Sequence, residues 1–286
     1  MMEILKIAVQ KSGRLKEGSM ELLKECGLRF INGNNQLKSQ STNFPVEIMF
    51  LRDDDIPEYV QDGVADIGII GENVWIEKNK KTELVKKLGF AKCRLSIAVP
   101  RDSKIIDNND LNSKRIATSY PVILSKYLKE NNISADIHEI SGSVEIAPGI
   151  GLADAILDIV STGSTLLSNG LTEIIEIMRS EAVMIRTSTL TTAKSEILDQ
   201  LLFRLAAVQN AQSNKYILLN APNDSVEKIS SILPGMDSPT VLPLKKEGWS
   251  SVHSVVNESD FWNKINQLKE AGATGILVVP IEKMIL

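Results

Sequence analysis

Residues 145–166 read EIAPGIGLADAILDIVSTGSTL, and this stretch decides how the rest of the sequence is interpreted. An apolar run carrying Asp154 and Asp158 ends in Ser161-Thr162-Gly163-Ser164-Thr165, after which a helical pattern begins. Gly163 permits a tight turn in which backbone amides converge on one point, and four hydroxyl side chains surround it. The pattern therefore predicts a strand followed by a phosphate-binding loop at the N-terminus of a helix.

The two aspartates suggest what else the ligand carries. Carboxylates repel a phosphate, but they accept strong, charge-assisted hydrogen bonds from ribose hydroxyls. Residues four apart on a strand share one face, so Asp154 and Asp158 should point the same way. We therefore expect a ribose 5-phosphate site in which the acids hold the ring and the loop holds the phosphate. An ordinary helix cap is the alternative, and the upstream acidic pair disfavours it.

Other nucleotide-binding motifs are not supported. The sequence has no GxxxxGK[ST] loop, and Gly149-Ile-Gly151-Leu-Ala-Asp154 ends in aspartate and precedes a strand instead of following one. Neither a P-loop kinase nor a Rossmann dehydrogenase fits this pattern. His138 and His253 are the only histidines, which disfavours zinc sites and a Ser-His-Asp triad.

Composition sets the broad class of protein. The chain has 286 residues, 43% of them hydrophobic, which predicts two or three globular domains. A net charge of −4 argues against nucleic-acid binding. No apolar run approaches the ~20 residues of a membrane helix, and the N-terminus lacks a signal-peptide pattern. Cys26 and Cys93 form no disulfide framework. We expect a cytoplasmic protein with no membrane partner and no nucleic-acid partner.

The order of apolar runs gives the domain organisation. Short apolar runs alternate with helical patterns, which indicates βαβ units and a mainly parallel sheet. The polar segment 101–112 resembles a crossing between domains. We expect a first domain at 1–100 with 182–211 returning to it, a second at 101–181, and a third at 212–286. The third domain shows a βαββαβ order, which is typical of a ferredoxin-like fold.

Through its whole length the sequence resembles the long form of ATP phosphoribosyltransferase. Residues 145–166 are similar to that family's phosphoribosyl pyrophosphate signature. The other similar segments are Gln10-Lys11-Ser12-Gly13-Arg14-Leu15, Arg52-Asp-Asp-Asp-Ile56, Gly63-Val-Ala-Asp66-Ile-Gly68-Ile-Ile-Gly71, Cys93-Arg94-Leu95-Ser96, Pro234-Gly-Met236-Asp-Ser238-Pro239-Thr240 and Gly272-Ala273-Thr-Gly.

The resemblance implies an α/β fold class and a set of site residues. Two domains like those of type II periplasmic binding proteins would form a catalytic cleft, and a ferredoxin-like, ACT-like α+β domain would follow. Phosphoribosyl pyrophosphate would be bound by Glu145, Asp154, Asp158, Ser161, Thr162, Gly163, Ser164 and Thr165. ATP and pyrophosphate would be bound by Lys11, Gly13, Arg14, Arg52 and Gly71. Mg²⁺ would act mainly through the substrate pyrophosphate.

The reaction implied is attack by adenine N1 of ATP on C1 of the ribose, with expulsion of pyrophosphate. The product is N1-(5-phosphoribosyl)-ATP, in the first step of histidine biosynthesis. Asp154 and Asp158 would be the catalytic residues, orienting a ring that develops positive charge. Histidine would inhibit from the third domain, through Met236, Ser238, Thr240 and Ala273. AMP and ADP are further expected inhibitors, and a homo-oligomer, dimer or hexamer, is the expected assembly.

Three other functions stay open at this point. A solute-binding protein shares the two-domain architecture, but it needs no phosphoribose motif. A catalytically inactive regulatory protein is disfavoured by the intact acidic pair and loop. A phosphoribosyltransferase with another acceptor base is disfavoured only by the resemblance. Pyrophosphate release from ATP and phosphoribosyl pyrophosphate distinguishes a solute-binding protein from the expected enzyme.

Overall fold

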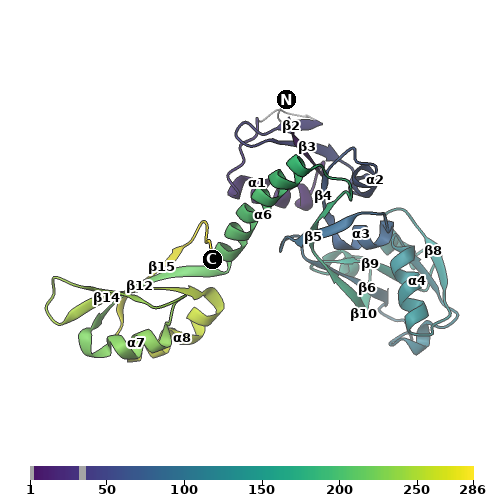
Figure 1. The fold of residues 1–286 in the computed structure, drawn as a ribbon. Coiled ribbons are helices and arrows are strands. Elements are labelled where there is room, and N and C mark those ends of the chain that lie inside the picture. The colour runs from purple at the N-terminus through teal and green to yellow at the C-terminus, as the bar shows by residue number, and fades with distance from the viewer. Residues whose placement is uncertain (1–2, 32–36) are drawn as a thin grey trace. The chain divides into compact units, whose positions relative to one another are not determined.

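The computed structural model describes residues 3–31 and 37–286, and the chain divides into two compact units. The first unit comprises Met1–Glu21 and Leu28–Ile197, and the second comprises Leu22–Gly27 and Leu198–Leu286. Two sheets lie in the first unit and one lies in the second (Figure 1).

The first sheet has the strand order β2-β3-β1-β4-β11-β5. Its strands are β1 (Leu5–Gln10), β2 (Lys38–Gln40), β3 (Val46–Leu51), β4 (Ile67–Gly71), β5 (Glu83–Lys87) and β11 (Ala182–Arg186). The accompanying helices are α1 (Arg14–Glu25), η1 (Asp53–Asp55), α2 (Ile56–Gln61) and α3 (Glu72–Lys78). β1 pairs in parallel with β3 and β4, so the carboxyl ends of these three strands lie along one edge of the sheet.

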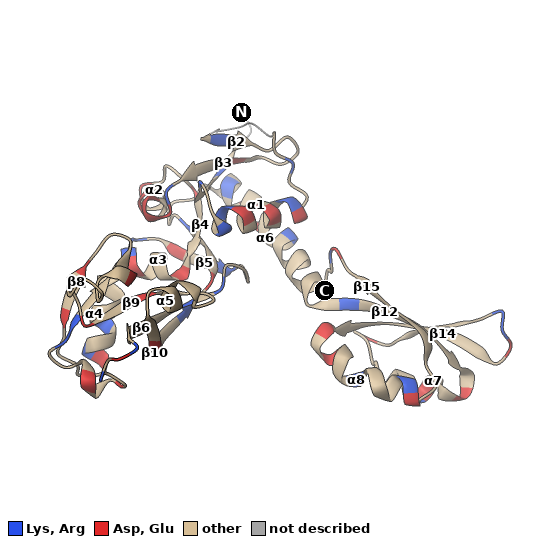
Figure 2. Cartoon of the chain, turned by 180° about the vertical axis from the view of Figure 1, so that it is seen from behind, with Lys and Arg blue, Asp and Glu red and all other residues tan. Residues whose placement is uncertain are grey.

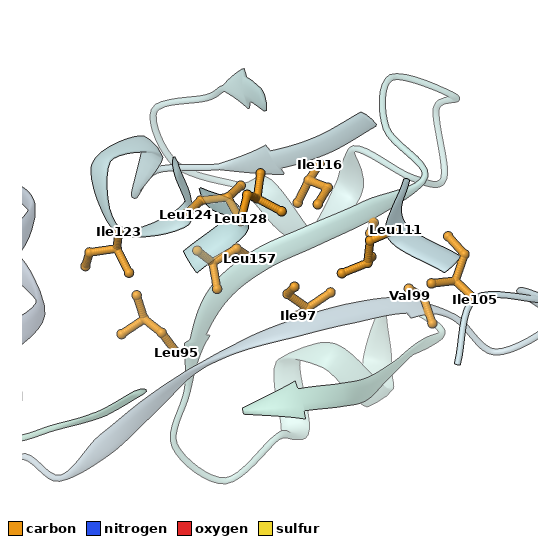
Figure 3. Packing of buried hydrophobic residues seen from close by; sticks show 11 residues of the cluster. Leu95, Ile97, Val99, Ile105, Leu111, Ile116, Ile123, Leu124, Leu128 and Leu157 are labelled. Atoms are coloured by element: carbon orange, nitrogen blue, oxygen red, sulfur yellow. The ribbon is translucent and has the colours of Figure 1, made fainter. Parts of the chain in front are cut away.

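The second sheet has the order β10-β6-β9-β7-β8. Its strands are β6 (Cys93–Pro100), β7 (Arg115–Thr118), β8 (Asp136–Glu139), β9 (Ala155–Val160) and β10 (Leu171–Ser180). Its helices are η2 (Asn109–Leu111), α4 (Pro121–Glu130), η3 (Val144–Ile146) and α5 (Ser164–Ser168). On one face, Leu95, Ile97 and Leu157 pack with α4 residues such as Leu124 in a continuous apolar core (Figure 3).

The boundary between the first two domains differs from the expected one. We expected 1–100 in the first domain and a crossing at 101–112, but β6 (Cys93–Pro100) lies inside the second sheet, between β10 and β9. The chain therefore leaves the first sheet after β5 and returns at β11. The 101–112 segment belongs to the second domain, where its Leu111 is fully buried. An apolar strand pattern carries no mark of the sheet to which it belongs, which is why the sequence misplaced β6.

The third sheet has the order β13-β14-β12-β15, and all of its pairings are antiparallel. Its strands are β12 (Asn214–Pro222), β13 (Thr240–Pro243), β14 (Trp249–Asn257) and β15 (Thr274–Pro280). Its helices are η4 (Asn223–Ser225), α7 (Val226–Ile232) and α8 (Glu258–Glu270), and α6 (Thr192–Gln212) precedes them. This arrangement confirms the predicted ferredoxin-like fold.

Charges of both signs are mixed along α1 and α8 (Figure 2). Within 3–31 and 37–286, no helix combines the length and apolarity needed to cross a membrane.

A buried ion pair ties the start of α6 to the first sheet. The Asp66 carboxylate, 6% exposed at the amino end of β4, accepts a hydrogen bond from the Lys6 amide at 2.8 Å. Lys194 Nζ of α6 lies 2.9 Å from the other oxygen of this carboxylate. Burying a carboxylate costs free energy unless a cation pairs with it, so this ion pair holds α6 against the sheet.

We expect Lys194→Met to lower the free energy of unfolding by about 3 kcal/mol, because it leaves a buried charge uncompensated. Lys38→Met is the matched control, since Lys38 is mostly exposed in its pair with Glu47, and it should cost less than about 1 kcal/mol. Urea unfolding measures both variants. Equal losses of unfolding free energy in the two variants would show that the buried Asp66–Lys194 pair stabilises the fold no more than an exposed ion pair does.

Candidate active site

The loop between β9 and α5 is held from both ends. Val160, the last residue of β9, and Leu166, in α5, are 2% and 5% exposed and belong to one apolar cluster. Between them the chain turns at Gly163, whose φ of 81° lies in the left-handed region. The hydroxyl residues of the loop are the exposed Ser161, Thr162, Ser164 and Thr165. Buried anchors on both sides of a polar turn hold the hydroxyls and amides of the loop at the surface.

This loop lines a cavity of about 240 Å³. The lining also includes the residues Arg14, Glu145 and Asp158. Arg14 begins α1, next to the first sheet, and its Nη1 donates to Ser161 Oγ at 3.4 Å. The Thr162 and Ser164 hydroxyls lie 3.0 Å apart. One cation, two carboxylates and four hydroxyls therefore meet in one small cavity, with groups suited to both a phosphate and sugar hydroxyls.

Asp158 is the acid of the β9 pair that reaches the cavity. Its Oδ1 accepts a hydrogen bond from the Ile159 amide at 2.7 Å. Burial raises the pKa of this carboxyl above its usual range, and the like charge of Glu145 raises it further. A partly buried carboxylate beside a second one favours a ligand that brings hydroxyls or a cation.

Asp154, which we expected to face the ribose, lies outside this lining. It precedes β9, and its carboxylate accepts hydrogen bonds from Arg115 Nη2 at 2.9 Å and from the Arg115 amide at 2.9 Å. These hydrogen bonds lower its pKa to about 2. Four residues along a strand preserve the face but separate the side chains by about 13 Å. Asp154 therefore braces the start of β9, and it is absent from the lining of the cavity.

The expected ATP-site residues surround the edge of the first sheet. Lys11, Arg52 and Gly71 lie at the carboxyl ends of β1, β3 and β4, and Gly13 takes a φ of 87° just before α1. A Cβ at position 71 would lie 2.4 Å from Asn73 Oδ1, so a side chain here would displace the Asn73 carboxamide. Among the residues of this group, Arg14 is the one that lines the cavity with the loop.

A buried polar network that the sequence did not reveal lies next to Asp158. Ser180 Oγ donates to Asn73 Oδ1 at 2.8 Å, and the backbone N–H of Asn73 donates to Ser180 Oγ at 3.1 Å. Burial raises the pKa of the Tyr120 hydroxyl, the charge of Asp158 raises it further, and a hydrogen bond with Asn73 opposes this. The network joins the first sheet's α3 to the start of α4, and only long-range contacts define it.

Glu77 of α3 provides a second contact of this kind. Its two carboxylate oxygens accept hydrogen bonds from the Val122 and Ile123 amides, at 2.9 and 3.0 Å. These amides belong to the first turn of α4, whose N–H groups have no partners within the helix. A helix of the first domain thus caps a helix of the second.

The expected histidine-site residues are not brought together within one chain. Met236 and Ser238 lie between α7 and β13, and Thr240 begins β13. Ala273 precedes β15 and is buried in the apolar core. Since β13 and β15 are opposite edges of the sheet, two strands separate these groups.

Comparison with known proteins identifies the family. The family model described as "ATP phosphoribosyltransferase" matches residues 52–207, and "HisG, C-terminal domain" matches 211–283. An ATP phosphoribosyltransferase of Cytophaga hutchinsonii is 60% identical over 285 residues, covering 100% of both chains. The chain belongs to the ATP phosphoribosyltransferase family. One of Bacteroides fragilis is 55% identical over 283 residues, covering 99% of this chain and 100% of the relative.

Solved structures agree with this assignment. A Thermotoga maritima structure titled "ATP phosphoribosyl transferase (HisG:HisZ) complex" has a TM-score of 0.60 and 30% identity, covering 71% of this chain and 98% of that one. A histidine kinase sensor domain similar to periplasmic binding proteins has a TM-score of 0.51 at 13% identity, covering 73% and 91%. The second likeness concerns the fold alone, and it confirms the predicted periplasmic-binding-protein-like architecture.

The chain is therefore an enzyme of this family, not a solute-binding protein of similar fold. It condenses ATP with 5-phosphoribosyl pyrophosphate to N1-(5-phosphoribosyl)-ATP and pyrophosphate, the first step of histidine biosynthesis.

Asp154→Asn should lower the free energy of unfolding while leaving the steady-state turnover rate nearly unchanged. The folded-state pKa of about 2 lies below the usual 3.8, so the ion pair stabilises above pH 4 and this stabilisation is lost as the pH falls towards 2. Because the side chain is 36% exposed, we expect about 1 kcal/mol at neutral pH after allowing for solvent screening.

Urea unfolding at pH 7 and pH 3, with steady-state rates, measures this. Asp136→Asn on the neighbouring β8 is the control, because Asp136 is exposed. Loss of turnover in a stably folded Asp154→Asn enzyme would show that Asp154 acts in the active site.

Proposed function

We propose that the cavity beside the β9–α5 loop binds phosphoribosyl pyrophosphate. The loop residues Ser161–Thr165 bind the 5-phosphate through amides and hydroxyls, and Arg14 adds a positive charge. Asp158 accepts hydrogen bonds from the ribose hydroxyls, with Glu145 beside it. The observation that carries the proposal is that one small cavity brings Asp158, Arg14 and the hydroxyl loop together.

We propose that ATP and the pyrophosphate lie along the edge of the first sheet, near Lys11, Gly13, Arg14, Arg52 and Gly71. In parallel α/β sheets, ligands bind outside the carboxyl ends of the strands. Lys11, Arg52 and Gly71 occupy three such ends. The cationic side chains of Lys11 and Arg52, together with the tight turn at Gly13, suit a polyanionic ligand that approaches the backbone closely.

The cofactor that we propose is Mg²⁺ carried by the substrate pyrophosphate. This ion usually takes one or two carboxylates together with phosphate oxygens and water, and the cavity offers Glu145 and Asp158. When bound, Mg²⁺ supplies positive charge that stabilises the leaving pyrophosphate.

Chemistry at this site rests on positioning and electrostatics. Adenine N1 already has a free lone pair, so the attack on C1 needs no strong general base. The ring gains positive charge as the bond to pyrophosphate breaks, and the Asp158 carboxylate stabilises that charge while it orients the hydroxyls. The loop fixes the other end of the sugar, which holds C1 in line with the attacking nitrogen.

For the third domain we propose binding of histidine as a feedback inhibitor at Met236, Ser238, Thr240 and Ala273. AMP and ADP are proposed as further inhibitors, and the proposed assembly is a homo-oligomer, a dimer or a hexamer. Because these residues lie at opposite edges of one sheet, a site formed by all of them requires two copies of the chain. We propose the cytoplasm as the location, which suits the free thiols Cys26 and Cys93.

Ser238→Ala and Thr240→Val should raise the histidine concentration needed for half-inhibition without changing the uninhibited rate. Coupling between such sites is typically about 1–3 kcal/mol, so a loss of about tenfold or more in sensitivity is expected. Inhibition curves measure this, with Ser231→Ala on α7 as the control. Unchanged sensitivity to histidine in both variants would show that the β13 segment is not part of the regulatory site.

Asp158→Asn should lower kcat/KM for phosphoribosyl pyrophosphate by about 30- to 150-fold, because charged hydrogen bonds worth about 2–3 kcal/mol in total are weakened. Thr165→Val should raise the KM for this substrate by about tenfold, since one hydroxyl donor is lost. Pyrophosphate release with ATP as co-substrate gives both values.

Thr172→Val, at an exposed position on β10, is the matched control for the loop variant. Wild-type kinetics in folded Asp158→Asn and Thr165→Val enzymes would show that the cavity is not the donor site.

A further inference from the structure

The Cys93-Arg94-Leu95-Ser96 segment is not explained by the cavity, although the sequence singles it out. It opens β6, which lies between β10 and β9 in the second sheet. Arg94 pairs with Val160 at the end of β9, and Ser96 pairs with Asp158. Both side chains therefore belong to the strand adjacent to the one that ends in the phosphate loop.

Arg94 is clamped by a carboxylate on the other neighbouring strand. Its Nε donates to Glu173 Oε1 at 2.6 Å, and its Nη2 donates to Oε2 at 2.5 Å, which is the two-pronged geometry of a strong Arg–carboxylate pair. Ser96 Oγ also donates to Glu173 Oε1, at 2.7 Å. Hydrogen bonds from Arg94 lower the pKa of Glu173, with a smaller contribution from Ser96.

The remaining terminal nitrogen of Arg94 reaches the loop. Its Nη1 donates to the Ser161 carbonyl oxygen at 3.4 Å, while Arg14 contacts the Ser161 hydroxyl. In a planar trans peptide the carbonyl and the following N–H point in opposite directions. Holding the Ser161 carbonyl towards Arg94 therefore directs the Thr162 N–H away from Arg94 and keeps a carbonyl oxygen from turning towards a bound anion.

We propose that Arg94, fixed by Glu173 and Ser96, is a positioning residue that keeps the Ser161–Thr162 peptide oriented for the 5-phosphate. The inference rests on the proposed donor site. Arg94 and Glu173 together carry no net charge, so the pair acts through geometry and not by attracting the substrate. Arg94 also does not line the cavity, which separates it from the residues that touch substrate.

The charge-conserving variant Arg94→Lys is the sharpest test, because lysine keeps the charge and loses the fork. We expect it to raise the KM for phosphoribosyl pyrophosphate by about tenfold and to leave the KM for ATP within about twofold, since a small misplacement of one binding group affects one substrate. Glu173→Gln should act in the same direction. Normal values for both substrates, or an equal rise in both, would overturn the proposal.

Arg179→Lys is the matched control. Arg179 lies on the same β10 strand, with its Nε 2.8 Å from Glu176 Oε1, and its side chain is 85% exposed. This control should keep wild-type KM values. Thermal melting checks the fold of each variant, and Ser96→Ala replaces Arg94→Lys if the latter unfolds. A wild-type KM for the donor in folded Ser96→Ala and Glu173→Gln enzymes would also overturn the proposal.

The double variant Arg94→Met with Glu173→Gln separates orientation from charge. It restores neutrality but leaves the Ser161 carbonyl unheld, so the raised KM for the donor should persist. Recovery of the wild-type KM would show that Arg94 only neutralises Glu173.

Comparison with Thr165→Val keeps this test apart from that of the donor site itself. If Thr165→Val raises the KM for the donor and the Arg94 variants do not, the positioning role fails and the donor site stands. If neither class of variant raises it, the donor site fails.

Discussion

A polar turn can bind an anion only if its amides and hydroxyls stay free to contact the ligand. Here two buried side chains, one on each side of the turn, hold the loop in such a conformation. Val160 and Leu166 pack into one apolar cluster, and the left-handed Gly163 lets the chain reverse between them. The hydroxyls and amides of Ser161–Thr165 are thereby held at the surface. The position of Asp158, two residues before Val160, follows from the same anchoring, and so does the cavity that both share.

Distance along β9 separates two acids that share a strand face. Asp158 lies beside the loop, where burial and Glu145 raise the pKa of its carboxyl. Asp154 lies just before the start of β9, where hydrogen bonds from Arg115 lower the pKa of the Asp154 carboxyl to about 2. The Asp158 carboxylate is thus available to a ligand, while the Asp154 carboxylate forms an ion pair that fixes the start of the strand. The division of roles is set by their neighbours, Glu145 and Arg115.

The sequence was sufficient for those features that depend on local chemistry. The apolar run before the hydroxyl-rich loop predicted the strand β9, and the βαββαβ order predicted the third sheet. The polar edge strand β5, with the sequence ELVKK, showed no such run and was missed. Contacts between segments far apart in the chain could not be predicted. These include the position of β6 in the second sheet, the Asn73–Ser180 network and the brace of Arg94 on the loop.

The proposed chemistry depends on binding of the sugar phosphate by the β9–α5 loop and Asp158. A crystal structure of the enzyme with phosphoribosyl pyrophosphate would show where this substrate binds. We expect the 5-phosphate to lie within hydrogen-bond distance of the amides and hydroxyls of Ser161–Thr165, and the ribose hydroxyls to bind Asp158. A 5-phosphate bound away from this loop, or ribose hydroxyls bonded to Asp154, would contradict it.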